Sequence, residues 1–99
     1  MAKSFVIQHD VSEVERWLHR HPDLAHIRVR KRGSLIILES GPDNDPVKHA
    51  RLRRTEVGLW ALEMPYRSGW QSTPFLDPEK EPLLELLHDD FGWTLMPIA

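Results

Sequence analysis

Four arginines with alternating spacing are the residues of this sequence best suited to binding chemistry. They form two pairs, Arg28 with Arg30 and Arg51 with Arg53, and the members of each pair are two positions apart. Every second side chain of a β-strand points to the same face, so each pair is expected to present two guanidinium groups together. A guanidinium group donates two parallel hydrogen bonds to a carboxylate or a phosphate. The spacing therefore predicts an anion-binding surface, provided that both strands present their pairs on one side of a sheet.

Charge is distributed unevenly around these arginines. The segment from His26 to Arg54 holds eight basic and three acidic residues, a net charge of +5, whereas the rest of the chain carries −7. The whole chain has a net charge of −2, so no overall field draws it to nucleic acid. Segregation on this scale favours contact between the basic segment and an acidic partner. The alternative is a solvated sheet face whose charges prevent aggregation.

Two tryptophans follow the second arginine pair along the chain. Trp60 shares a strand face with Leu62 and Met64, which predicts a core position for its ring. Trp70 follows a turn and is the expected exposed anchor. Tryptophan and arginine are the residues most enriched at binding hot spots, so we place Trp70 with the four arginines among the candidate binding residues.

Histidine supplies the one route to catalysis that the sequence leaves open. His49 has the same alternation as Arg51 and Arg53, so we expect it on the anion- or partner-binding face. His26 or His49 beside an arginine would be suited to general acid or base catalysis on a phosphodiester. His19-x-His21 does not indicate a metal site, because residues two apart on a helix point in different directions. We expect no metal and no other cofactor.

The usual catalytic motifs are absent from the sequence. The chain has no cysteine, which excludes thiol nucleophiles, disulfides and zinc–thiolate sites. No serine lies in a G-x-S-x-G elbow, and neither common phosphate-binding glycine loop is present. We therefore predict no catalytic residue, and the sequence favours a binding protein over an enzyme.

Length and hydropathy limit where the protein is expected to work. The 99 residues are the size of one domain, residues 1–99. The segment Met1–Ile7 is too short and too polar for a signal peptide. The longest apolar run, Leu35–Leu38, is far shorter than the roughly 20 residues of a membrane helix. We expect a soluble cytoplasmic protein without membrane contact.

The elements that must position the arginines predict an α+β fold. Runs of strands between helices favour a mostly antiparallel sheet of four to six strands flanked by two helices, in the order β-α-β-β-β-β-β-α. The expected segments are a short strand at Phe5–Ile7, a helix from Asp10 or Ser12 to His21, a hairpin at His26–Glu39, strands at Val47–Thr55, Gly58–Met64 and Trp70–Phe75, and a helix that begins at Asp77-Pro78 and ends at Gly92.

Two acids at the end of the second helix break a local rule. Asp89 and Asp90 oppose the negative end of the helix dipole. They would be compensated if they paired with the arginines, which would neutralise the basic face. Alternatively, they contact another protein, or they are solvated at a small cost in stability.

Three functions follow from these residues. The first is a small non-enzymatic binding, adaptor or regulatory protein that contacts another protein, or a second copy of itself, through a basic sheet face. The alternative is a nucleic-acid-binding module that uses the same arginines, and the third is a small histidine-dependent phosphodiesterase or nuclease. The candidate binding residues are Arg28, Arg30, Arg51, Arg53, Trp70 and His49.

Overall fold

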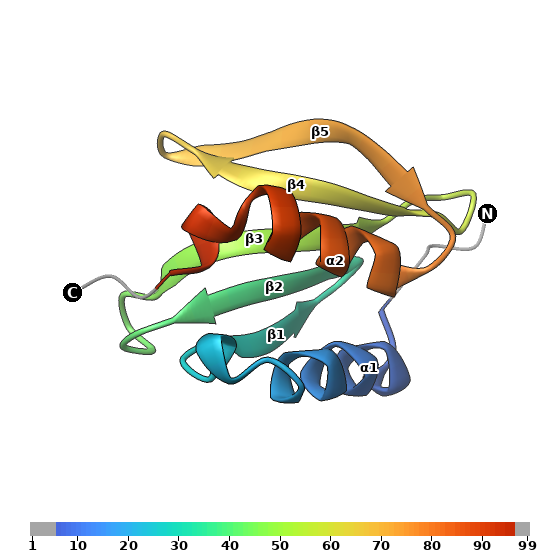
Figure 1. Ribbon diagram of the computed structural model, residues 1–99. Helices are drawn as coiled ribbons and strands as arrows, with labels where there is room; N and C mark the ends of the chain where they lie inside the picture. The colour runs from blue at the N-terminus through green and yellow to red at the C-terminus, as the bar shows by residue number, and fades with distance from the viewer. Residues whose placement is uncertain (1–5, 97–99) are drawn as a thin grey trace.

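The structure is a computed structural model, and it describes residues 6–96 (Figure 1). Five strands form one antiparallel sheet in which each strand pairs with the next along the chain. This architecture confirms the predicted α+β class, strand count and element order. The elements are α1 (Gln8–His19), the 3₁₀ helix η1 (Pro22–Leu24), β1 (Arg28–Arg32), β2 (Leu35–Ser40), β3 (Val47–Arg54), β4 (Trp60–Tyr66), β5 (Gly69–Asp77), α2 (Lys80–Asp90) and the 3₁₀ helix η2 (Gly92–Leu95).

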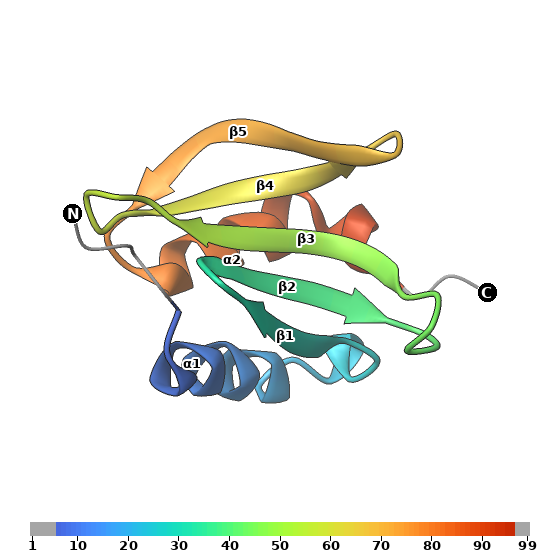
Figure 2. The ribbon, with the colours of Figure 1, turned by 180° about the vertical axis from the view of Figure 1, so that it is seen from behind.

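Both long helices pack on the same side of the sheet. In Figure 1 α2 lies across the strands and α1 runs beside β1, whereas in Figure 2, seen from behind, the strands stand in front of α2. The opposite side of the sheet carries no helix within residues 6–96. We call it the open face.

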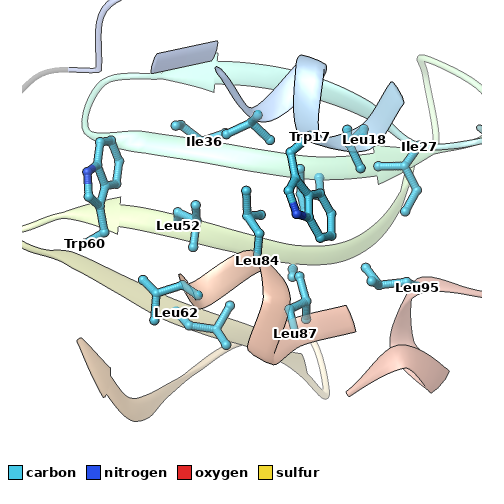
Figure 3. Close-up of a cluster of buried hydrophobic side chains, with 14 of the residues drawn as sticks. Trp17, Leu18, Ile27, Ile36, Leu52, Trp60, Leu62, Leu84, Leu87 and Leu95 are labelled. Carbon is cyan, nitrogen blue, oxygen red and sulfur yellow. The ribbon is translucent and has the colours of Figure 1, made fainter. Parts of the chain in front are cut away.

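The hydrophobic core fills the space between the helices and the sheet (Figure 3). Trp17 of α1 and Leu84 and Leu87 of α2 meet the inward side chains of the central strands, and all are almost completely buried. Burial of an aliphatic or aromatic side chain of this size stabilises the fold by roughly 1.5–3 kcal/mol. The buried hydrophobic residues that the strands contribute to this core are Ile36, Leu38, Ala50, Leu52, Trp60 and Leu62.

A buried ion pair joins the first turns of the two helices. Lys80 Nζ lies 3.0 Å from Asp10 Oδ1 and 3.3 Å from Glu13 Oε1. The Lys80 ammonium group also lies 4.9 Å from the centre of the Trp60 ring. Removal of one partner from such a pair leaves an uncompensated buried charge, so the pair fixes how α1 and α2 meet.

Both helices begin at residues other than those predicted from the sequence. α1 starts at Gln8, where the Ile7 amide donates to Asp10 Oδ2 at 3.1 Å, so neither Asp10 nor Ser12 is the N-cap residue. α2 starts at Lys80, and Asp77 Oδ1 instead accepts a hydrogen bond from the Glu79 amide at 2.9 Å. Asp10 thus caps α1 from its third residue and not from the N-cap position, and Asp77 forms a side-chain turn before α2.

The remaining differences concern strand ends. Phe5 of the predicted first strand lies outside the described residues, and Ile7 leads directly into α1. β4 continues through Pro65, which the sequence predicted as an interruption, because Pro65 pairs with Trp70 near the β4–β5 turn. Among residues 6–96, neither α1 nor α2 has the length and apolar character needed to cross a bilayer.

Candidate functional site

The strand register places both arginine pairs on the open face. Arg30 lies opposite Ile37, which lies opposite Arg51, which in turn lies opposite Glu63. Directly opposed residues of antiparallel strands point to the same side of the sheet, so Arg30 and Arg51 share a face. The row beside it runs from Arg32 through Leu35 to Arg53 and Ala61. The condition for a shared basic surface is therefore met.

Two buried glutamates lie beneath the arginines. Glu39 of β2 and Glu63 of β4 are only 3% and 4% exposed, although no helix within residues 6–96 covers the open face. The arginine side chains themselves shield them, as long charged side chains do when their stems lie on a surface and their heads reach water. Each glutamate binds two arginines, which divides the basic surface into two clusters.

The first, which we call the Glu39 cluster, consists of Arg28, Arg30, Glu39 and Asp43. Arg28 donates to Glu39 Oε2 from Nε at 3.3 Å and from Nη2 at 3.1 Å, and its Nη1 donates to the carbonyl of Gly41. Arg28 Nη2 also lies 3.3 Å from Asp43 Oδ1, and Arg30 Nη2 lies 3.2 Å from Glu39 Oε1. The second of these contacts lacks hydrogen-bond geometry, so Glu39 Oε1 accepts no hydrogen bond from residues 6–96.

The second, the Glu63 cluster, consists of Arg51, Arg53, Glu63 and Ser72. Arg51 Nε donates to Glu63 Oε1 at 2.6 Å, and Arg53 Nε donates to Glu63 Oε2 at 2.9 Å. The Ser72 hydroxyl donates to Glu63 Oε2 at 3.2 Å. Burial raises the pKa of Glu63, but the hydrogen bonds from Arg53 and Arg51 outweigh it and hold that pKa below its usual value. Glu63 is therefore a carboxylate at neutral pH.

The two tryptophans lie on opposite sides of the sheet. Trp60 is 1% exposed in the core, as predicted. Trp70 lies on the open face, where it is half-buried because the guanidinium carbon of Arg51 stacks 4.4 Å from its ring centre. Trp70 therefore supports Arg51 by a cation–π contact and presents less open ring than an exposed tryptophan would.

Of the three alternatives for Asp89 and Asp90, the structure excludes the pairing of these acids with the four arginines. Asp89 lies 3.7 Å from His88 on α2, on the helix side of the sheet, and the arginine counterions are Glu39 and Glu63. One sequence signal for Glu63 was present. Glu63 alternates with Trp60, Leu62 and Met64 along the strand. If those three residues face the core, Glu63 points to the opposite face, where the arginines lie.

The prediction that His49 lies beside the arginines is wrong. A register shift between Leu38 and Glu39 places Lys48 opposite Glu39, and His49 turns to the helix side, where it is 1% exposed. Such a bulge adds one residue to a strand and reverses the alternation beyond it. A bulge leaves no reliable signal in a single sequence.

His49 instead anchors η2 to the sheet. His49 Nδ1 lies 2.6 Å from the Thr94 carbonyl oxygen, and His26 Nε2 lies 2.6 Å from the Leu95 carbonyl oxygen. Burial lowers the pKa of His49, and the neighbouring His26 lowers it further, against the bond to Thr94. The neutral ring donates from Nδ1, so Nε2 accepts from the Ser40 hydroxyl at 2.7 Å.

This serine–histidine contact has the atoms of a nucleophile and its base, but its position is that of a structural bond. Ser40 and His49 are both buried, and the third group is a backbone carbonyl that fixes the imidazole. The arginines lie on the other side of the sheet. His49 thus does not meet these four arginines in the way that phosphodiester chemistry requires.

No group of three histidine, aspartate or glutamate side chains within residues 6–96 is placed to hold a metal ion. No known protein-family model matches the sequence, and neither a curated protein nor a solved structure matches the chain. The residues of the open face are therefore the basis on which a function can be proposed.

Proposed function

We propose that this chain is a non-enzymatic binding module that contacts an acidic region of another protein through the open face, and we expect it to act in the cytoplasm. The observation that carries the proposal is the convergence of Arg30, Arg51 and Arg53 on a sheet face that no helix within residues 6–96 covers. Arg32 and Lys48 extend the same surface, so cations outnumber carboxylates there. An acidic partner complements this charge.

The mixture of side chains favours a protein over nucleic acid as the partner. Aliphatic residues alternate with the arginines across the sheet, since Leu35 lies between Arg32 and Arg53 and Leu76 ends the same row with 54% of its surface exposed. Single-stranded nucleic acid binds on open aromatic rings beside cations, whereas Arg51 occupies one side of the Trp70 ring. Arginine next to partly covered apolar groups is the composition of protein interfaces.

The experiment compares labelled probes of two kinds, peptide and DNA, by fluorescence anisotropy at low and moderate salt. One is a short peptide of alternating glutamate and serine, and the other is mixed-sequence DNA, single-stranded and duplex. We expect the peptide to bind more tightly than either DNA, and Arg51→Ala with Arg53→Ala to weaken its binding. The matched control is Arg16→Ala with Arg20→Ala, which removes the same charge from exposed positions of α1 and its C-cap.

Two outcomes would overturn the proposal. Tight DNA binding that falls steeply with salt, through release of counterions from phosphate, would favour the nucleic-acid alternative. Absence of peptide binding even at low salt would remove the open face as a binding surface for acidic proteins.

A further inference from the structure

The arginines of the open face differ in how many donors they have already used. Arg28 engages all three of its nitrogens: Nε and Nη2 with Glu39, and Nη1 with the carbonyl of Gly41. Its Nη2 also contacts Asp43, so the side chain ties the β2–β3 loop to β1. An arginine in this state has little hydrogen-bonding capacity left for a partner.

Arg51 and Arg53 are in the opposite state. Each binds Glu63 through Nε, and no hydrogen bond runs from their Nη groups to any other side chain or backbone atom of residues 6–96. Both Nη groups of each guanidinium therefore keep their donors. Because the buried Glu63 already fixes both side chains, a ligand that binds them loses less conformational entropy than it would on two mobile arginines.

The geometry of Glu63 brings the two guanidinium groups together. Arg51 binds one oxygen of the carboxylate and Arg53 binds the other, at 2.6 Å and 2.9 Å. Two arginines on the oxygens of a single carboxylate present their guanidinium groups around the same point of the open face. Stacking on Trp70 holds the plane of the Arg51 guanidinium in one orientation.

The charge of the cluster selects the ligand. Two guanidinium groups and one carboxylate leave a single positive charge, which one further carboxylate neutralises. A phosphate dianion would leave an excess negative charge next to the buried Glu63, and like charges at short range are costly.

We propose that the Glu63 cluster is a carboxylate receptor, in which Arg51 and Arg53 together bind one aspartate or glutamate side chain of an acidic protein segment. The Glu39 cluster lies outside this receptor: Arg28 clamps the β2–β3 loop, and Arg30 adds positive charge to the open face. The inference rests on the proposed function and specifies which part of the open face binds the carboxylates of the partner.

The test uses charge-preserving substitutions, because a variant that removes charge would weaken any electrostatic contact. Arg51→Lys with Arg53→Lys keeps the field of the open face but removes the forks. Arg28→Lys with Arg30→Lys is the matched control, two residues of the same spacing beside the other buried glutamate. Both are titrated with the glutamate–serine peptide and with versions in which glutamine or phosphoserine replaces each glutamate, and circular dichroism verifies that each variant folds.

We expect the Glu63-cluster variant to weaken glutamate-peptide binding about tenfold, and the Glu39-cluster variant to change it less than about twofold. The glutamine peptide should not bind, and the phosphoserine peptide should bind no better than the glutamate peptide. In wild-type protein, the side-chain Nε–H signals of Arg51 and Arg53 should shift in NMR spectra as peptide is added, whereas that of Arg28 should stay in place.

Equal losses in the two lysine variants, or tighter binding of the phosphoserine peptide, would overturn the carboxylate receptor and leave the proposed function standing. If the NMR signals of Arg51 and Arg53 stay in place while the peptide binds, the receptor is likewise wrong. If no peptide binds to wild-type protein, the proposed function fails, and the receptor fails with it.

Discussion

The Glu39 cluster and the Glu63 cluster are built from the same parts and differ in what surrounds them. Each places a buried glutamate beneath two arginines that are two residues apart on one strand. Arg28 lies on the edge strand β1, within reach of the carbonyl of Gly41 and the carboxylate of Asp43 in the following loop. Arg51 and Arg53 lie on the central strand β3, where Glu63 is their only hydrogen-bond acceptor within residues 6–96.

The difference teaches that an arginine on a sheet face is a binding group only to the extent that its donors remain unused. The number of positive charges is equal in the two clusters, yet the loop satisfies Arg28, and no such loop is within reach of Arg51. A count of charges would treat both clusters as one basic patch. A count of the hydrogen-bond donors in use separates Arg28 from the other three arginines.

The largest expected effect is a difference in how much stability is lost when each buried glutamate is replaced by glutamine. Glu63→Gln places an amide donor where both carboxylate oxygens accept, and we expect it to lower the free energy of unfolding by about 2–3 kcal/mol. Glu39→Gln should cost about 1 kcal/mol, because the amide oxygen can take the place of Oε2, which accepts both hydrogen bonds from Arg28, while Oε1 accepts none within residues 6–96. Urea unfolding measures both values, and equal losses would contradict the assignment of acceptors.

The next effect concerns single arginines. Arg28→Ala removes three hydrogen bonds at once and should lower the free energy of unfolding by about 2 kcal/mol. Arg53→Ala should cost about 1 kcal/mol, since Arg51 and Ser72 still bind Glu63. Hydrogen exchange should in addition show faster opening of the β2–β3 loop in the Arg28 variant alone. An unchanged loop would mean that Arg28 is not its clamp.

Acid should reduce the contribution of the Glu63 cluster. The arginines hold the pKa of Glu63 below its usual value of 4.5, so its stabilisation is complete above that pH and is lost as the pH falls through the folded-state pKa. The difference in unfolding free energy between wild-type protein and Glu63→Gln should therefore be constant from about pH 7 to 5 and shrink by about 1 kcal/mol or more at lower pH.

The difference in unfolding free energy between wild-type protein and Glu63→Gln also excludes the contribution of His49 protonation. Burial holds the pKa of His49 below 6.5, so its stabilisation is complete above pH 6.5 and declines as the pH falls below that value. Wild-type protein and Glu63→Gln share this loss, which cancels in the difference. A difference that began to shrink near pH 6.5 would show that Glu63 and His49 are coupled, against their positions on opposite sides of the sheet.

The smallest effect tests the third donor of the Glu63 cluster. Ser72→Ala removes the 3.2 Å bond from the exposed hydroxyl to Glu63 Oε2 and should cost about 0.5 kcal/mol in thermal unfolding. Ser68→Ala, in the turn between β4 and β5, serves as the control and should have no measurable effect. If the two substitutions lowered stability equally, Ser72 would not contribute to the Glu63 cluster.

Strand alternation was sufficient to predict the sheet and the shared faces of the arginines. It also predicted the buried position of Trp60, whereas the runs of strands between helices predicted the antiparallel sheet. These features repeat every second residue, so a single sequence contains them. The faces of Arg28 with Arg30 and of Arg51 with Arg53 follow from the same rule.

The features that sequence reasoning missed depend on contacts between distant residues. Whether Glu63 meets Arg51 depends on the register of β3 against β4, and whether Lys80 pairs with Asp10 depends on how two helices 70 residues apart pack. His49 was misplaced for the same reason, because the bulge that turns it inward arises from the pairing of β2 with β3. Spacing along the chain fixes none of these contacts.

The strand order has a consequence for how the chain folds. Because β1 to β5 pair strictly with their neighbours in sequence, each hairpin closes over a short loop and can form before the next one is complete. Folding rates rise as the contacts of a protein become more local, so the sheet should assemble faster than sheets of similar size with crossover connections. The contact between α1 and α2 joins two segments far apart in the chain. Its formation should be the slow step, after the meander is already in place.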